Sequence, residues 1–243
     1  MEIRGKTALV TGAAKRVGRE IALHLASRGA DIVLHYRSSE AEAKKTSEEI
    51  AKFGVRCHMT RADLAKSADI SAMVTELEKK KIGVDILVNS ASLFYKTPLS
   101  KVKESDWDAF LDSNLKGPFL LSQALGQKMA GGNGGKIINI ADWSGFRPYK
   151  NYMPYCVSKG GLITLTKSLA RDLAPKVYVN AIAPGPVLQP ENLSAEENAE
   201  VVKKTLLGRW GTPQDIANAV SFLLESDFIN GFLLVVDGGR SIA

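Results

Sequence analysis

The sequence has few of the residues that bind metal ions or form disulfides, with two cysteines and three histidines among 243 residues. Cys57 and Cys156 lie far apart in the chain, so they fit neither a disulfide framework nor a zinc site, and we expect two reduced thiols in or near the core. No apolar run approaches the roughly 18 residues of a membrane span, and the first residues, MEIRGKTALVTG, lack the pattern of a secretory signal. The sequence therefore predicts a cytoplasmic protein with no membrane partner and no metal site.

The formal net charge is +6 at pH 7, which on its own could indicate a protein that binds nucleic acid. The basic side chains are spread among acidic ones, however, and the densest cluster, KKK at 79–81, is typical of a solvated helix end. A basic surface attracts a small molecule that carries phosphate equally well. We therefore expect a small-molecule partner and no nucleic acid.

Short apolar runs rich in β-branched residues alternate with segments of helical spacing. The strands are expected at residues 7–12, 31–37, 55–64, 85–91, 136–142, 177–185 and 232–239, and the helices at 16–29, 40–54, 67–83, 106–130 and 152–174. Apolar runs without alternation indicate strands covered on both faces, and strands that alternate with helices form right-handed crossovers. The pattern predicts the α/β class, with a single-domain Rossmann-type doubly wound fold over residues 1–243 and a seven-stranded parallel sheet flanked by helices.

One polar segment interrupts the last third of the chain. Residues 188–200 read LQPENLSAEENAE, without the apolar runs of the neighbouring strands. Long polar connections in a compact domain often act as lids over a substrate. We therefore predict a substrate flap at about residues 188–206.

The first strand runs into TGAAKRVG, and a helix follows at once. Gly12 and Gly18 lie where backbone amides and the positive end of that helix can meet a pyrophosphate. A pair of glycines alone is a weak signal, but its place after the first strand of a βαβ unit is what a dinucleotide site needs. The competing interpretation is a tight turn from strand to helix without a ligand.

The second strand ends in HYRSS, where folds that bind NAD usually carry an acid for the ribose hydroxyls. Arg37, Ser38 and Ser39 offer instead a positive charge and hydroxyl donors, which suit a 2′-phosphate. The sequence therefore favours NADPH/NADP+ over NADH as the cofactor. The alternative is an Arg37 that is simply exposed at a strand end.

An acid, Asp142, ends the apolar run of the fifth predicted strand, and YCVSK follows thirteen residues later. Tyr155 and Lys159 are four residues apart, so they share one face of a helix. A nearby ammonium favours tyrosinate, and we expect Lys159 to lower the pKa of Tyr155 from its ordinary value near 10. Tyr155 would then be a proton donor close to neutral pH.

The order of these motifs resembles the short-chain dehydrogenase/reductase family over essentially the whole chain. The matching pieces are TGAAKRVG, ADL at 62–64, NSAS at 89–92, DSNLKGPF, YCVSK, NAIAPGPV at 180–187 and DGG at 237–239. The resemblance implies that Tyr155 protonates the group being reduced, that Lys159 lowers its pKa and binds the nicotinamide ribose, and that Asn114 holds a water relay. It implies cofactor binding by Gly12, Lys15, Arg16, Val17, Gly18, Tyr36, Arg37, Ser38, Ser39, Asp63, Leu64, Asn89, Ser90, Ala91, Tyr155, Lys159, Pro184, Gly185 and Val187. It also implies a homotetramer.

The chain departs from the usual family pattern at the acid. Most of the family carries Ser where this chain has Asp142, and an ionised carboxylate cannot donate to a substrate carbonyl as a hydroxyl does. Asp142 suits a substrate that presents N–H donors, and once protonated it could pass a proton to a ring nitrogen. Gln189 also stands where the family usually has Thr, which leaves the contact with the nicotinamide carboxamide open.

That combination resembles the pteridine reductase branch, which includes dihydromonapterin and dihydrofolate reductases of this fold. The branch shares Arg16, HYRSS, Asp142 and an aromatic residue after the NSAS turn, here Phe94. The resemblance implies substrate binding by Arg16, Phe94, Asp142 and Tyr155, with Phe94 stacking on the pterin.

We therefore predict an NADPH-dependent reductase that transfers hydride to a C=N bond of a pteridine, with Asp142, Tyr155, Lys159 and Asn114 as catalytic residues. One alternative keeps the enzyme class but changes the substrate to a 3-oxoacyl thioester, a sugar or another ketone. A second is a non-catalytic protein that senses NADP. Asp142 could also be only a helix-cap acid at the end of the sheet.

Overall fold

The computed structural model describes residues 1–189 and 193–243 and contains a seven-stranded sheet. The strands are β1 (Thr7–Val10), β2 (Asp31–Tyr36), β3 (Cys57–Arg61), β4 (Ile86–Asn89), β5 (Gly135–Ile140), β6 (Val177–Pro184) and β7 (Leu233–Val236). All neighbouring strands run parallel, in the order β3-β2-β1-β4-β5-β6-β7. The predicted fold class and the seven strands are confirmed, although each strand ends before its predicted last residue.

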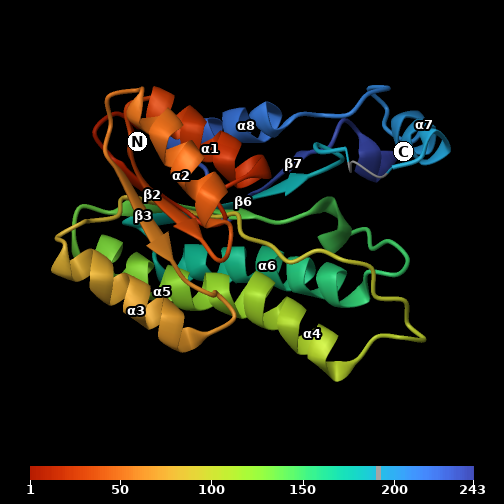
Figure 1. The fold of residues 1–243 in the computed structure, drawn as a ribbon, viewed down its shortest axis with the longest axis horizontal. Helices are drawn as coiled ribbons and strands as arrows, with labels where there is room; N and C mark the ends of the chain where they lie inside the picture. The colour runs from red at the N-terminus through yellow and green to blue at the C-terminus, as the bar shows by residue number, and fades with distance from the viewer. Residues whose placement is uncertain (190–192) are drawn as a thin grey trace.

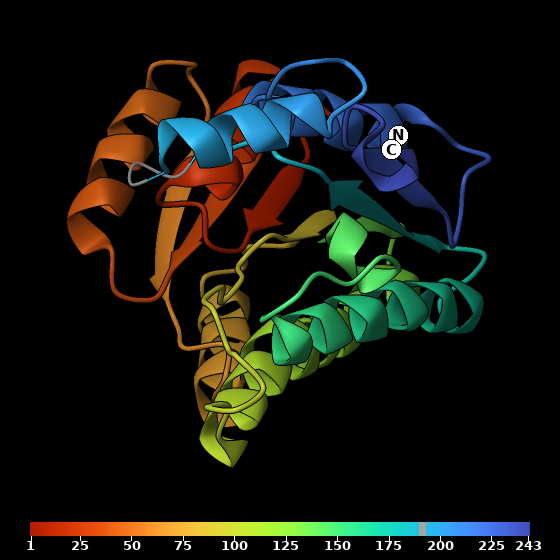
Figure 2. The ribbon, with the colours of Figure 1, turned by 90° about the vertical axis from the view of Figure 1, so that its right-hand side faces the viewer.

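Helices cover both faces of the sheet, as Figures 1 and 2 show. One layer contains α1 (Arg16–Ser27), α2 (Glu40–Ala51) and α8 (Pro213–Glu225). The other contains α3 (Ser67–Lys79), α4 (Glu104–Leu111), α5 (Gly117–Gly131) and α6 (Met153–Asp172). The short α7 (Ala195–Lys203) lies outside both layers, near the C-terminus in Figure 1.

The strands alternate their side chains between two apolar cores, because successive residues of a strand point to opposite faces. Val10 and Leu34 pack in the core under α1, α2 and α8, whereas Leu9 and Val33 pack in the core against α3, α5 and α6. All four side chains are buried. This burial on both faces is the physical reason for the continuous apolar runs in the sequence.

The long helix predicted at 106–130 is divided in the structure. A π-helical turn, Asp112–Lys116, separates α4 from α5, and it contains Asn114. The side chain of Asn114 bonds to both backbone groups of Leu93, which holds this turn against the segment after β4. At the start of α5, a Cβ on Gly117 would lie 2.5 Å from the Leu64 carbonyl oxygen, so the backbone approaches the turn after β3 too closely for any side chain. The apolar pattern is continuous through this region and therefore gives no sign of the break.

The strand order reverses between β1 and β4, since the chain winds outward from β1 through β2 to β3 and then returns. The loops on the two sides of such a reversal diverge at the carboxyl ends of the strands, and this leaves a crevice for a ligand. The carboxyl ends of β1, β4 and β5 therefore fix where the site lies. None of the helices in the two described ranges is long and apolar enough to cross a membrane.

Candidate active site

Asp142 and Tyr155 are in direct contact beyond the carboxyl end of β5. The Tyr155 phenol donates to Asp142 Oδ2 at 2.8 Å. Asp142 Oδ1 accepts the Ser144 amide at 2.7 Å, so the same carboxylate also caps the short helical turn Trp143–Gly145. Asp142 thus caps this turn, as one interpretation of the sequence predicts, while its other oxygen accepts the phenol; its contact with a substrate stays a prediction.

Lys159 lies one turn along α6 from Tyr155 and is buried. Its Nζ donates to the Ile140 carbonyl at 2.8 Å and lies 5.7 Å from the centre of the Tyr155 ring. Burial lowers the pKa of Lys159 to about 8, while the charge of Asp142 acts in the opposite direction. The pKa of Lys159 therefore lies only a little above neutral pH, and the amine loses its charge when the pH rises past about 8.

The expectation that the pKa of Tyr155 lies below its ordinary value is wrong for this structure. Burial raises the pKa of Tyr155 well above its ordinary value, and the Asp142 carboxylate raises it further. Burial is the larger cause, and Asp142 rather than Lys159 accepts the hydrogen bond of the phenol. Tyr155 thus keeps its proton across the physiological range, which suits a proton donor.

Asn114 connects α6 to the segment that follows β4. Its Oδ1 accepts the Leu93 amide at 2.7 Å, and its Nδ2 donates to the Leu93 carbonyl at 3.0 Å and to Ser158 Oγ at 3.3 Å. Ser158 Oγ in turn donates to the Tyr155 carbonyl at 2.7 Å. The side chain of Asn114 positions the elements that carry Phe94 and Tyr155, and its part in a water relay stays a prediction.

Aromatic rings line the approach to Asp142. Phe94 is 51% exposed, stacks on Tyr152 with centroids 4.9 Å apart, and meets Tyr155 edge-on at 4.8 Å. Tyr149 donates to Asp142 Oδ1 at a longer 3.4 Å and packs on Trp143. We call Phe94, Trp143, Tyr149 and Tyr152 the aromatic wall. The sequence left the last three unassigned. Trp143 follows Asp142 directly, whereas the path of the loop brings Tyr149 to Asp142 and Tyr152 to Phe94.

The glycine-rich loop fits a bound pyrophosphate. Gly12 has φ +66°, and a Cβ there would lie 2.9 Å from Ala91 Cα. α1 begins after Lys15 without a side-chain cap and without an acid in its first turn, so its first amides and its positive end remain available to an anion. The Gly12 amide itself donates to His35 Nδ1. Gly12 would therefore contribute to pyrophosphate binding by letting the backbone pass close to it, and not by donating a hydrogen bond. Arg16 is exposed at the start of α1 with a left-handed φ of +59°.

Basic and hydroxyl side chains gather where the 2′-phosphate of NADPH was predicted to bind. Arg37 and Ser38 are exposed, and Ser39 begins α2 without forming a side-chain cap. Arg61 Nε donates to the Arg37 carbonyl at 3.1 Å, which places a second guanidinium beside this segment. Arg61 belongs to none of the sequence motifs; it reaches this segment because Arg61 of β3 pairs with Tyr36 of β2.

Several residues that the resemblance implied for the cofactor hold the loops together. Thr11 Oγ1 accepts the amides of Ser90 and Ala91, each at 2.9 Å. The Asn89 amide group donates to Ser122 and Asn139 in the core. The remaining predicted residues lie at the same end of the sheet. Lys15 forms an ion pair with Glu42, and Asp63 accepts the Ala65 amide. Leu64 is buried, Pro184 ends β6 with Gly185 directly after it, and three residues are half-buried: Val17, Tyr36 and Val187. Their contacts with a cofactor stay predictions.

The predicted flap at 188–206 falls partly on residues 190–192, which lie outside the described residues. Within the described part, α7 begins with a reciprocal cap between Ser194 and Glu197. The charge of Glu197 contributes to a raised pKa of Tyr152, for which burial is the larger cause. The first turn of α7 therefore lies close enough to act on the aromatic wall, while the motion of the flap stays a prediction.

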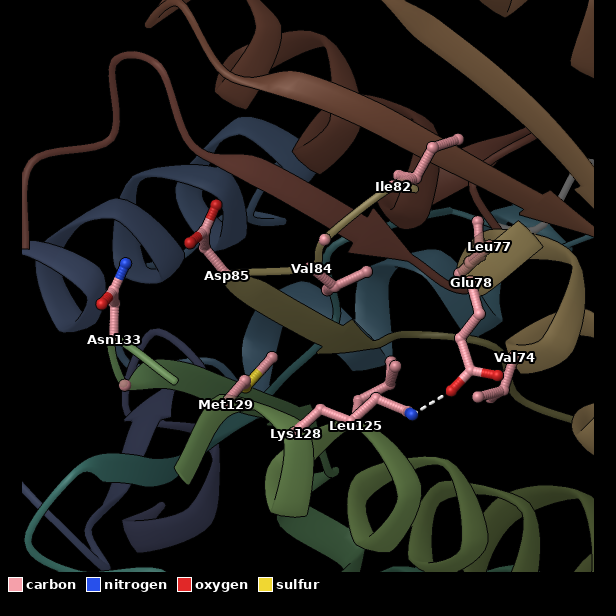
Figure 3. A pocket seen from close by; sticks show the side chains of 12 residues that line it. Val74, Leu77, Glu78, Ile82, Val84, Asp85, Leu125, Lys128, Met129 and Asn133 are labelled. Carbon is pink, nitrogen blue, oxygen red and sulfur yellow. Dashed lines mark hydrogen bonds and ion pairs between the residues drawn. The ribbon is translucent and has the colours of Figure 1, made fainter. Parts of the chain in front are cut away.

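A separate cavity of about 210 Å³ lies between α3 and α5 (Figure 3). Val84 and Asp85, which precede β4, line it together with Leu77 and Met129, and an ion pair between Glu78 and Lys128 crosses its rim. These residues lie at the amino ends of the strands, opposite Asp142. The cavity therefore has no part in the site.

Comparison with known proteins places the chain among oxidoreductases. A family model described as enoyl-(acyl carrier protein) reductase matches residues 12–241. The 3-oxoacyl-[acyl-carrier-protein] reductase of Aquifex aeolicus is 37% identical over 98% of each chain, and the 2-dehydro-3-deoxy-D-gluconate 5-dehydrogenase of Escherichia coli is 37% identical over 98% of this chain and 96% of its own. The crystal structure of a gluconate 5-dehydrogenase from Burkholderia cenocepacia, in complex with NADP and tartrate, superposes with a TM-score of 0.93 at 33% identity and covers 100% of this chain and 98% of its own. These names match the carbonyl alternative better than they match a pteridine reductase.

Proposed function

Because the chain belongs to the short-chain dehydrogenase/reductase family, we propose that it is an NADPH-dependent reductase in which Tyr155 is the proton donor. The observation that carries this proposal is the 2.8 Å bond from the Tyr155 phenol to Asp142, beside the buried Lys159. The uncapped start of α1 and the basic segment at 37–39 support the cofactor. The solved relative with bound NADP supports it as well.

The cofactor, when bound, supplies the hydride, and the chain supplies the proton. The Tyr155 hydrogen turns from Asp142 Oδ2 to the substrate atom beside the carbon that is reduced. The Lys159 ammonium then favours the tyrosinate that remains, since opposite charges attract strongly in a buried site. Asn114 and Ser158 hold α6 in place during this transfer.

An ionised Asp142 opposes that step, because it would face tyrosinate at a short distance. Two like charges at hydrogen-bond distance are strongly disfavoured in a buried site. A substrate that donates an N–H to Asp142, or a proton on Asp142 itself, relieves this repulsion. A simple ketone offers no such donor.

On this ground we propose a pteridine as the substrate class that the site favours. A pteridine ring carries N–H donors for Asp142 and a flat face for Phe94 of the aromatic wall. The support comes from this chain's own Asp142, Phe94 and Arg16, and not from the relatives.

The second candidate is reduction of a ketone, in a 3-oxoacyl thioester or a sugar acid. The named relatives favour it, since all three act on such groups by name. In this case Asp142 mainly holds Ser144 and Tyr155 in position, and the phenol alone contacts the substrate oxygen.

A spectrophotometric assay of NADPH oxidation separates the candidates. The panel contains dihydropterins, dihydrofolate, an acetoacetyl thioester and keto sugar acids. On the pteridine proposal, Asp142→Ser cuts pterin turnover by about a hundredfold, within the range for loss of acid–base catalysis. Unchanged pterin turnover in this variant would refute the pteridine proposal.

Asp106→Ser is the matched control for Asp142→Ser. Asp106 also accepts a phenol, from Tyr95 at 2.9 Å, but it lies at the start of α4 outside the site. We expect it to change stability without changing the order of substrates. Oxidation of NADPH with any member of the panel would also exclude the non-catalytic NADP sensor.

Arg37→Asp tests the cofactor preference. The new carboxylate repels the 2′-phosphate, so the preference for NADPH over NADH should fall by at least about tenfold, as expected for loss of one charge-assisted contact. The ratio of kcat/KM for the two cofactors measures it. Equal use of both cofactors by the native protein would count against the 2′-phosphate site.

We also propose the homotetramer that the family resemblance implies. Trp107, Phe119 and Val157 on α4, α5 and α6 are exposed apolar side chains, which a subunit contact could cover. Light scattering on the purified protein gives the mass directly.

A further inference from the structure

His35 is a buried histidine that connects two segments of the cofactor cradle. It lies in β2 and is 2% exposed. The Gly12 amide donates to its Nδ1 at 3.1 Å, and its Nε2 lies 3.1 Å from the Ala62 carbonyl. Its backbone carbonyl also accepts the Ala13 amide at 3.0 Å. One side chain thus spans from the phosphate loop after β1 to the turn after β3.

These partners allow one form of the ring. Nδ1 must accept from Gly12 and therefore carries no hydrogen, so the hydrogen lies on Nε2 and is donated to Ala62. Burial lowers the pKa of His35 to about 4, so the neutral form persists at neutral pH. A protonated ring could not accept the Gly12 amide at all.

Gly12 is the second residue after the end of β1. Its φ of +66° places it in the left-handed region, and the loop passes within close contact of Ala91. The bond to His35 fixes the direction of the Gly12 amide and with it the path to the first turn of α1. At its other end, His35 holds Ala62, the neighbour of the predicted cofactor-binding residue Asp63.

We propose that His35 is a positioning residue for the dinucleotide, which holds the phosphate loop and the turn at Ala62 at a fixed separation before the cofactor binds. This inference rests on the proposed NADPH-dependent reductase. Packing alone does not require an imidazole here, because the adjacent Val33 and Leu34 are fully buried aliphatic residues in the same strand. Burying a polar ring is unfavourable unless its hydrogen bonds are needed.

Three substitutions separate the two hydrogen bonds. His35→Leu removes both of them. In His35→Asn, the side-chain oxygen occupies the place of Nδ1 and can accept the Gly12 amide, but the side chain is too short for Ala62. In His35→Gln, the amide nitrogen occupies the place of Nε2 and can donate to Ala62, but nothing accepts from Gly12.

The first readout is the Kd for NADPH, measured by fluorescence titration at pH 7. Loss of the Gly12 bond should raise the Kd about tenfold in His35→Leu and in His35→Gln. His35→Asn should stay within about threefold of the native protein. Rescue by Asn and not by Gln is a result that a general packing role would not produce.

The second readout needs no cofactor. Hydrogen exchange of the peptide that contains Gly12 should be faster in His35→Leu and His35→Gln than in the native protein and in His35→Asn. His58→Leu is the control, since His58 lies in the next strand and bonds to Glu76 in α3, away from the loop. It should leave both the Kd and this exchange unchanged.

The outcomes are distinguishable. No binding of NADPH by the native protein would overturn the proposed function and the role of His35 with it. Binding by the native protein with the same Kd in all three variants would overturn the role of His35 alone. An Asn variant as weak as the Leu variant would also overturn it, because the acceptor at Nδ1 is the stated cause.

Discussion

Among the residues that the structure describes, two lysines are buried, and of these two Lys136 alone forms an ion pair. Lys136 donates to Asp227 at 2.9 Å and to the Ser226 carbonyl at 2.6 Å. Lys159 has the Ile140 carbonyl as its hydrogen-bond partner, and burial lowers its pKa to about 8. A charge buried with so little compensation destabilises the fold, and such residues are typical of functional sites.

The first prediction concerns the stability cost of Lys159. Its pKa falls on folding from 10.5 to about 8, so between these values the unfolded chain binds more protons than the folded chain. The free energy of unfolding therefore rises with pH across this window, and the full penalty is present below pH 8. We expect Lys159→Met to be inactive but more stable at pH 7, on the order of 2 kcal/mol, and this gain should shrink towards pH 10.

Denaturant unfolding at several pH values measures this effect, and Lys136→Met is the control. That variant loses an ion pair instead of an uncompensated charge, so it should be less stable than the native protein at pH 7. A Lys159→Met protein that is less stable at pH 7 would show that the buried amine contributes net stability.

The second prediction concerns the pH profile. If the Lys159 ammonium is needed, kcat/KM for NADPH should fall above about pH 8, because this ratio reports groups of the free enzyme. The charge of Asp142 raises the pKa of Lys159. Asp142→Asn removes that charge, so the basic limb should move to lower pH. A limb that stays in place or moves upward would contradict the coupling of Asp142 to Lys159.

Among the elements, α7 and α8 begin with the same reciprocal cap but differ in burial. α8 starts at the Thr212–Asp215 cap and buries seven residues, whereas α7 starts at the Ser194–Glu197 cap and buries none. Because α8 packs on α1, its cap belongs to the cooperative unit of the fold.

The third prediction follows from this difference. Thr212→Ala should lower the global free energy of unfolding by about 1 kcal/mol, the usual effect of losing a cap. Ser194→Ala should leave it nearly unchanged and only loosen α7, because an exposed helix frays on its own. Urea denaturation measures the first effect, and hydrogen exchange of residues 195–203 measures the second. An equal loss of global stability in Ser194→Ala and Thr212→Ala would show that α7 belongs to the cooperative unit of the fold.

The elements were largely predictable from the sequence, but their interruptions were not. Continuous apolar runs gave the seven strands, since both faces of the sheet are buried. The break at Asn114 depends on its bonds to Leu93, more than twenty positions away in the chain. A contact of that kind leaves no periodic signal in the segment itself.

For the whole molecule, the order of the motifs predicted where the site lies, whereas tertiary contacts determine the hydrogen bonds and pKa values of its residues. Spacing alone put Tyr155 and Lys159 on one face of α6 and Asp142 at the end of β5. It could not give the sign of the pKa shift of Tyr155, which depends on burial and on which group reaches the phenol. Tyr149, Arg61 and His35 stayed unassigned because loop paths and strand register bring them to the site.

The fourth prediction concerns the response of the whole fold to cofactor. NADPH that binds only the folded chain should stabilise it by about 2.7 kcal/mol at a hundred times its Kd. NADH at the same concentration should stabilise it much less, because it lacks the 2′-phosphate for Arg37. Thermal unfolding with each nucleotide measures the difference, and equal shifts in Tm would contradict the assignment.

The central pair of the sheet joins distant parts of the chain. Ala8 of β1 pairs with Ile86 of β4, and β1 also lies beside β2. During synthesis on the ribosome, a nascent chain that ends after β3 therefore exposes one whole edge of β1. The crevice between the loops after β1 and β4 forms only when β4 pairs with that edge, so a chain released before β4 has an unpaired strand edge and no complete site.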